Sequence, residues 1–375
     1  MRTRVKDLLG TEFPILAFSH CRDVVAAVSK TGGFGVLGAV AHTPEQLDHD
    51  LSWIREEAGG APFGVDLLLP QKYVGADEGG LDDDQTAALL PVGHRAFLDG
   101  LLDNYGVPPL PDGDHVAPHA LNVSPAGIAP LLDVAFSHPI RLIASALGPP
   151  PPYLIERAHG EDVVVAALAG SPVHATRHAA AGADIIVAQG TEAGGHTGEI
   201  ATMVLVPEVV DAVAPIPVLA AGGIGRGRQL AAALALGAEG VWCGSVWLTT
   251  EEAETDPVVK QKFLAAKSSD TIRSRSLTGK PARMLRTAWT EEWERPDAPA
   301  PLPMPLQSAL VAEAQERIHR SAHHPGSGAE TLDTYFVGQV VGTLNHVKTA
   351  RQVVLDMIDE YIDTYERLRK LTEED

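Results

Sequence analysis

The chain has 375 residues, of which 45% are hydrophobic, enough for a large core in one or two domains. Its 29 Lys and Arg residues stand against 49 Asp and Glu residues, and a net charge of −20 argues against binding to nucleic acid, which would be repelled. The two cysteines, Cys21 and Cys243, provide neither a disulfide framework nor a zinc-binding spacing. We also expect a cytoplasmic protein, because the N-terminus lacks a signal-like apolar block and no run reaches the roughly 18–20 apolar residues of a membrane helix.

Short runs rich in Val, Ile, Leu and Ala predict eight strands, most of them separated by segments of helical composition. Several of these runs are apolar throughout, as in parallel strands that are buried on both faces. Eight such units favour an α/β fold of the (β/α)8 TIM-barrel type, although a doubly wound sheet would use the same units. The expected strands are Pro14–Ala17, Gly35–Leu37, Gly64–Leu69, Arg141–Ser145, Val163–Leu168, Ile185–Ala188, Pro217–Ala220 and Gly240–Cys243.

Two regions interrupt this alternation of strands and helices. Residues 71–124 form an acidic insertion, punctuated by Gly and Pro, after the third expected strand. It follows a strand on the side of a barrel that carries catalysis, so it is either a lid or a decorated surface loop. Residues 251–375 are expected to form a mainly helical C-terminal region packed on the barrel, which would comprise residues 1–250.

Glycine-rich loops follow the last two expected strands. Gly222 and Gly223 come after one of them, and Gly244 and Ser245 after the other. Barrels commonly bind phosphate at this position, because glycine lets the backbone approach an anion closely and its N–H groups can point at the oxygens. We therefore expect a phosphate site here. The stretch GIGRG is not a dinucleotide fingerprint, because no acidic residue lies at the expected distance beyond a following strand.

The stretch AQGTEAGGHTG places one histidine, His196, among Gly194, Gly195 and Gly198. It follows the strand that precedes the two phosphate loops in chain order. The glycines suggest that a ligand lies close to the backbone, and His196 is the side chain of this loop that can accept a proton near neutral pH. The alternative is a solvated histidine on a surface loop.

Other histidines and Cys21 offer weaker candidates. No carboxylate or cysteine partner stands near His174, His178, His323 or His324 in the sequence, so we expect them to be solvated or capping residues and predict no metal site. Cys21 follows the first strand and either faces the ligand or lies in the core, the commoner place for a free cysteine.

Taken together, these motifs resemble the nitronate monooxygenases, formerly called 2-nitropropane dioxygenases, which are FMN-dependent TIM-barrel oxidoreductases. The resemblance extends over most of the chain and includes FPILAF, TGGFGVLGA, AQGTEAGGHTG, PIPVLAAGGIG, EGVWCGS and LTGKPARMLR. The GGHxG and AAGGI segments also occur in flavin-dependent enoyl-ACP reductases. They therefore imply the barrel and FMN more strongly than the reaction.

The resemblance implies a role for His196 as the base that removes the α-proton of a nitroalkane. Asp66 stands where the family usually has asparagine, and a carboxylate beside a flavin would have to be protonated, paired or turned away. The residues that the resemblance implies for cofactor binding are Ala17, Phe18, Ser19, Asp66, Gln189, Gly194, Gly195, Gly222, Gly223, Gly244 and Ser245.

The expected function is the FMN-dependent oxidation of alkyl nitronates, and also of nitroalkanes, by O2 to a carbonyl compound and nitrite. The expected partners are this small substrate and O2, with no nucleic acid and no membrane, and a homo-oligomer is left open. Two alternatives remain at this point. One is an NAD(P)H-dependent FMN reductase of the enoyl-ACP reductase type, and the other is a barrel that binds FMN or another phosphate ligand without turnover.

Overall fold

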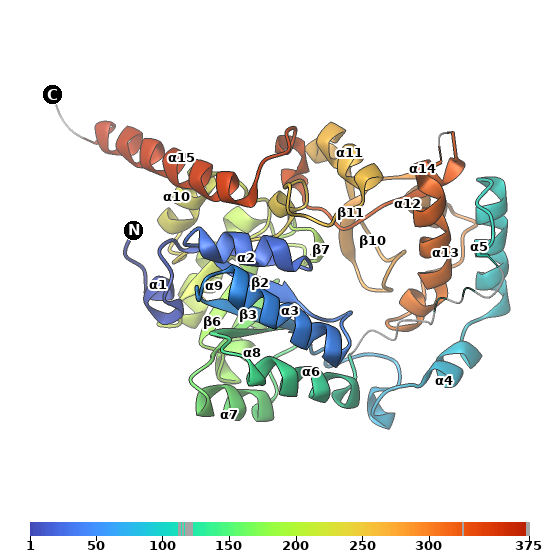
Figure 1. Ribbon diagram of the computed structural model, residues 1–375, viewed down its shortest axis with the longest axis horizontal. Coiled ribbons are helices and arrows are strands. Elements are labelled where there is room, and N and C mark those ends of the chain that lie inside the picture. Colours follow the sequence, from blue (N-terminus) through green and yellow to red (C-terminus); the bar gives the residue numbers. More distant parts are fainter. Residues whose placement is uncertain (112–113, 115, 117–122, 325, 373–375) are drawn as a thin grey trace.

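The eight expected strands close into a parallel barrel, which confirms the (β/α)8 prediction (Figure 1). The computed structural model describes residues 1–111, 114, 116, 123–324 and 326–372. Neighbouring barrel strands follow chain order, and β9 pairs with β1 to complete the circle. The barrel strands are β1 (Ile15–Ser19), β2 (Phe34–Gly38), β3 (Phe63–Leu68), β4 (Leu142–Ala146), β5 (Val164–Ala169), β6 (Ile185–Gln189), β8 (Val218–Ala221) and β9 (Val241–Cys243).

Helices cover the outside of the barrel, except the first, whose Val5 and Leu9 pack with the barrel interior. Local signals in the sequence set where many of the helices begin. Thr43 and Gln46 form a capping box at the start of α3, and Ser171 caps α8. Side chains such as Leu16, Val36 and Leu219 fill the barrel interior. The barrel helices are α1 (Arg4–Leu9), α2 (Arg22–Lys30), α3 (Pro44–Glu57), α6 (Pro125–Ser137), α7 (Pro152–Gly160), α8 (Pro172–Ala180), α9 (Thr202–Val213) and α10 (Gly227–Ala235).

The C-terminal region is mainly helical, but it also contains a small antiparallel sheet that we did not expect. Its strands are β10 (Thr271–Ser274) and β11 (Ala282–Leu285), and β11 pairs with β7 (Gly195–His196) from the barrel sequence. The helices of this region are α11 (Pro257–Ala265), α12 (Ala288–Trp293), α13 (Leu306–Ala322), α14 (Gly328–Leu332) and α15 (Ala350–Lys370). The 3₁₀ turns found in the described part of the chain are η1 (Ala76–Glu78), η2 (Ser245–Trp247), η3 (Ser268–Asp270) and η4 (Gln339–Thr343).

The described part of the 71–124 insertion forms α4 (Asp83–Ala88) and α5 (Val92–Asn104), which lie beside α13 in Figure 1. Leu98 and Leu101 of α5 share a core with Trp293 and Leu310. The insertion is therefore held by the C-terminal region. Its role as a lid stays a prediction, since most of residues 112–122 lie outside the described residues.

Helix α15 joins the end of the chain to the barrel. It packs along α10 so closely that a Cβ on Gly227 would lie 2.1 Å from the carbonyl oxygen of Met357. Glu360 forms ion pairs with Arg226 and Arg228 at the start of α10. None of the helices that the structure describes has the length and apolar character to cross a membrane.

Candidate active site

Both expected phosphate loops lie at the carboxyl ends of adjacent strands, β8 and β9. The hydrogen bonds found among the described residues do not use the backbone N–H groups of Gly222, Gly223, Gly244 or Ser245. Gly222 and Gly223 have φ values of 106° and 69°, which favour glycine. Four N–H donors without acceptors at this end of a barrel fit the oxygens of one phosphate group.

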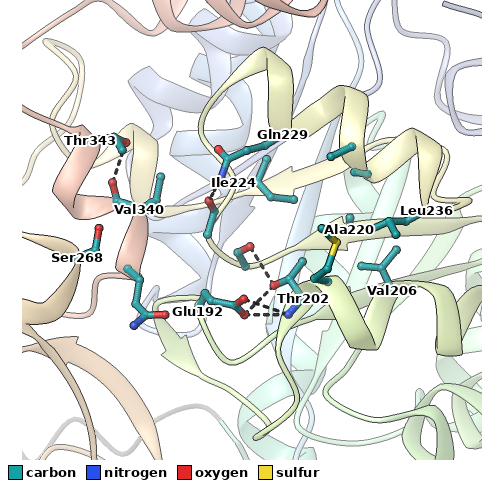
Figure 2. A pocket seen from close by; sticks show the side chains of 16 residues that line it. Glu192, Thr202, Val206, Ala220, Ile224, Gln229, Leu236, Ser268, Val340 and Thr343 are labelled. Atoms are coloured by element: carbon teal, nitrogen blue, oxygen red, sulfur yellow. Dashed lines mark hydrogen bonds between the residues drawn. The ribbon is translucent and has the colours of Figure 1, made fainter. Parts of the chain in front are cut away.

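A cavity of about 340 Å³ borders Gly222 and Gly223 between α9 and α10, and Figure 2 shows Glu192 and Thr202 on its wall. The Glu192 carboxylate accepts hydrogen bonds from the backbone N and the Oγ1 of Thr202, at 2.9 and 2.8 Å. Gln229 holds the other side of the glycine loop through the carbonyl of Gly223, at 2.5 Å. Because Glu192 would repel an anion in this cavity, we expect a phosphate on the barrel side of the loop.

His196 lies in β7, opposite Ala282 of β11. Its Nδ1 is 3.4 Å from the carbonyl oxygen of Pro281, and its ring centroid is 6.5 Å from that of Phe336. Burial lowers the pKa of His196 to about 4. The ring is therefore neutral at pH 7, and the contact with Pro281 favours a proton on Nδ1, which leaves Nε2 free to accept one.

Three cationic residues stand close to the His196 loop, and the sequence analysis missed their role. Arg283 is 8% exposed, and its Nε and Nη1 donate to Thr191 and Thr271 at 2.7 and 3.0 Å. Nη2 of Arg273 donates to the carbonyl oxygen of Thr197 at 3.3 Å.

The third cation, Lys280, precedes Pro281, and the charge of Lys280 contributes to the lowered pKa of His196. Burial lowers the pKa of the Lys280 ammonium itself. Positive charge at this place, in a chain with a net charge of −20, favours an anionic ligand. Two of these cations, Lys280 and Arg283, stand in the stretch LTGKPARMLR, and their spacing was the signal in the sequence for an anion-binding site.

The structure places the Asp66 carboxyl in a buried site on β3, and 5% of the residue is exposed. No hydrogen bond or ion pair to this carboxyl is found among the described residues, and burial raises the pKa of Asp66 to about 8. Of the three expected outcomes for Asp66, protonation is the one that the structure favours. A neutral carboxyl can donate a hydrogen bond, as the amide of asparagine does.

The residues expected beside the ligand at the end of β1 lie at the rim of the barrel. Ala17 instead lies in the middle of β1 and is buried in the core between barrel and helices, whereas the ring of Phe18 stacks on Trp242 at 6.3 Å between centroids. The Oγ of Ser19 accepts a hydrogen bond from the backbone N of Cys21 at 3.1 Å. Cys21 packs in the core between barrel and helices, the commoner of its two expected positions.

Close packing and backbone conformation within the protein account for the glycines around His196. A Cβ on Gly194 would lie 2.8 Å from the backbone N of Gly338, and one on Gly198 would lie 2.5 Å from the carbonyl oxygen of Gly170. Gly195 needs its φ of 73° and has open space beside it. Gln189 ends β6 and pairs with Ala221 of β8, the residue before Gly222. Packing thus explains two of the three glycines without a ligand.

The expectation that His323 has no carboxylate partner is wrong. Its Nε2 lies 2.8 Å from Oδ2 of Asp256, which is distant in sequence but caps the start of α11 near the end of α13. His178 is buried rather than solvated, and its Nε2 contacts the carbonyl oxygen of Leu168 at 3.0 Å. His174 and His324 are exposed, as expected.

Comparisons with known proteins place the chain in a family. The model of the family described as "Nitronate monooxygenase" matches residues 2–360. The chain is 70% identical over 374 residues to "Putative monooxygenase Rv1533" of Mycobacterium tuberculosis, with full coverage of both chains. Two of the solved structures to which the chain is similar match it over almost its whole length. A nitroalkane oxidase from Streptomyces ansochromogenes has a TM-score of 0.79 and 27% identity, covering 97% of this chain and 99% of the other. FabK from Thermotoga maritima has a TM-score of 0.73 and 30% identity, covering 99% of both chains.

Proposed function

Because the chain belongs to the nitronate monooxygenase family of flavin oxidoreductases, we propose that it uses FMN and O2 to oxidise alkyl nitronates to a carbonyl compound and nitrite. The observation that carries the proposal is the neutral His196 beside the cationic Lys280. A nitronate is an anion formed by loss of the α-proton from a nitroalkane, so its recognition calls for a positive charge and its formation calls for a base.

We assign the proton transfer to His196. Nε2 of the neutral ring accepts the α-proton when a nitroalkane is the substrate. The ammonium of Lys280 would stabilise the negative charge that develops on the nitro oxygens. The buried Arg283 holds the Thr191 end of the loop in place through its hydrogen bond at 2.7 Å. FMN, when bound, supplies the redox chemistry by taking electrons from the substrate and passing them to O2.

We propose FMN rather than FAD, with Gly222, Gly223, Gly244 and Ser245 holding its phosphate. Their N–H donors fit one phosphate group, and the sequence has no adenylate-binding fingerprint. Asp66, being protonated, would add no negative charge to the site and could donate to a flavin heteroatom. Ala17, Phe18, Ser19, Gln189, Gly194 and Gly195 remain proposed neighbours of the flavin.

The purified protein provides the first test. It should be yellow and release FMN on denaturation, and a nitronate should bleach the flavin under anaerobic conditions. Release of FAD would contradict the assignment of the cofactor. Rapid bleaching by NADH or NADPH, with no response to nitronate, would replace the proposal with the reductase alternative that the shared GGHxG signature leaves open. Bleaching by neither would favour a barrel that binds FMN without turnover.

A further inference from the structure

Four side chains that can bind metal ions meet in the C-terminal region, away from the glycine loops. Asp256 directly precedes α11, and Asp333 directly follows α14. His319 lies in the last turn of α13, and His323, four residues on, is its helical C-cap residue, so the two side chains project from the same side. Figure 1 shows α11, α13 and α14 on the same side of the molecule.

The donor atoms of these residues are close to one another. Oδ2 of Asp256 is 2.8 Å from Nε2 of His323 and 3.6 Å from Nε2 of His319. Nδ1 of His319 is 3.9 Å from Oδ1 of Asp333. One donor atom each from Asp256, His319 and Asp333 lies within 4.8 Å of the others. Four ligands at zinc's bond lengths of about 2.0–2.2 Å stand roughly 3.4 Å apart in a tetrahedron, so these three side chains need only small rotations, and His323 would join them through its contact with Asp256.

Asp333 provides an independent sign that a ligand belongs here. Its side chain is 5% exposed, and its Oδ2 has no hydrogen-bond partner within the described part of the chain. The nearby ammonium of Lys262 donates to the main-chain carbonyls of Glu330 and Asp333 instead of to the carboxylate. A buried carboxylate oxygen without a partner is costly, and a bound cation would remove that cost.

We propose that Asp256, His319, His323 and Asp333 bind one divalent transition-metal ion, for which zinc is the appropriate probe. Two imidazoles and two carboxylates match the ligands that zinc prefers, whereas magnesium and calcium favour sites made of oxygen atoms alone. The two carboxylates also balance the charge of a divalent ion. A site closed by four protein ligands is typical of a structural metal rather than a catalytic one.

The site would fix the segment that runs from Asp333 toward His196. Oγ1 of Thr334 donates to the carbonyl oxygen of Leu285 at 2.8 Å, and the ring of Phe336 lies beside His196. The backbone N of Gly338 then donates to Oγ of Ser245 at 2.8 Å. A metal at the start of this segment would stabilise the C-terminal region whatever reaction the barrel catalyses.

Equilibrium dialysis of the full-length protein, first stripped with a chelator, tests the site. Zinc should bind with a stoichiometry of one per chain and raise the melting temperature, and equal concentrations of magnesium or calcium should do neither. Cobalt in place of zinc should give the visible absorption of a four-coordinate ion. Failure of zinc to bind at micromolar concentration would overturn the proposal.

Variants identify the ligands. His319→Ala and His323→Ala should each weaken zinc binding by at least about tenfold, the lower range seen when groups supporting a metal site are lost. The matched control is His324→Ala, which removes an exposed histidine beside the cluster. Asp256→Asn keeps an oxygen to cap α11 and guards against loss of folding, which circular dichroism would detect. Equal zinc affinity in the unaltered protein, His319→Ala and Asp256→Asn would show that zinc binds elsewhere and overturn the assignment.

Discussion

Two regions of the molecule each hold a histidine, and their surroundings act on it in opposite directions. In the barrel region, burial and the neighbouring Lys280 lower the pKa of His196. In the C-terminal region, the nearby carboxylates of Asp333 and Asp256 raise the pKa of His319. A histidine is thus a neutral base in the barrel region and a partner of carboxylates in the C-terminal region. Burial, with a smaller contribution from a cation, favours the neutral ring at His196, whereas neighbouring carboxylates favour the charged ring at His319.

The largest expected effect comes from removing the neutral histidine. His196→Asn should lower turnover of a neutral nitroalkane by roughly 10²–10⁴-fold, the range typical of a lost general base. A preformed nitronate has already lost its α-proton, so its turnover should fall much less. Steady-state kinetics with both forms of one substrate, at equal FMN content, would measure this difference. Equal losses for both forms would mean that His196 positions the substrate or tunes the flavin.

The charge beside His196 can be removed while the histidine remains. Lys280→Met should raise the KM for a nitronate by about 10–100-fold, which corresponds to the roughly 1.5–3 kcal/mol of a hydrogen bond to a charged group. The matched control is Lys370→Met, at the exposed end of α15. An unchanged KM in Lys280→Met would show that its ammonium does not contact the substrate.

A change at Asp66 tests whether the barrel region tolerates a negative charge. Because the pKa of Asp66 is raised to about 8 on folding, the folded chain holds a proton that the unfolded chain has already lost above about pH 4. Stability conferred by the native residue should therefore fall as the pH rises toward 8, by up to about 1.4 kcal/mol per pH unit.

Asp66→Asn should remove this dependence. Urea unfolding at pH 5 and pH 7.5 would measure the free energy of unfolding of both proteins. The stability of the variant relative to the native protein should be higher at pH 7.5 than at pH 5. A constant difference between them at both values would mean that Asp66 is ionised in the folded protein.

The smallest effect is expected at His319 in protein kept free of metal by a chelator. Its raised pKa means that its ion pairs stabilise the fold below about pH 6.5 and lose this contribution as the pH rises through the folded-state pKa. His319→Ala should therefore destabilise the protein more at pH 6 than at pH 8.5. The side chain is half exposed, so the difference should be only a few tenths of a kcal/mol, measurable from urea midpoints. A larger loss of stability at pH 8.5 than at pH 6 would contradict a raised pKa for His319.

The sequence predicted the barrel well because each strand is marked locally. Val164–Ala169, for example, is an apolar run between two helical segments, and it forms β5. The glycine loops after β8 and β9 were found for the same reason. The sheet of β7, β10 and β11 was missed because each strand has only two to four residues and is defined by its partners.

The surroundings of the two histidines could not be predicted for a related reason. Arg283 reaches the His196 loop only because β11 pairs with β7, and Asp256 reaches His323 only because the fold brings the start of α11 to the end of α13. The sequence shows which side chains can carry charge. Their environment depends on contacts between residues that are far apart in the chain.

The pairing of β7 with β11 also limits how this protein can be rebuilt. By position in the chain, Gly195 and His196 belong to the barrel, but their backbone is hydrogen-bonded to Ala282 and Arg283 of the C-terminal region. The two parts are therefore not interchangeable modules. A chimera that joined this barrel to the C-terminal region of a relative would carry half of the His196 environment from each parent, so strand and partner would have to be exchanged together.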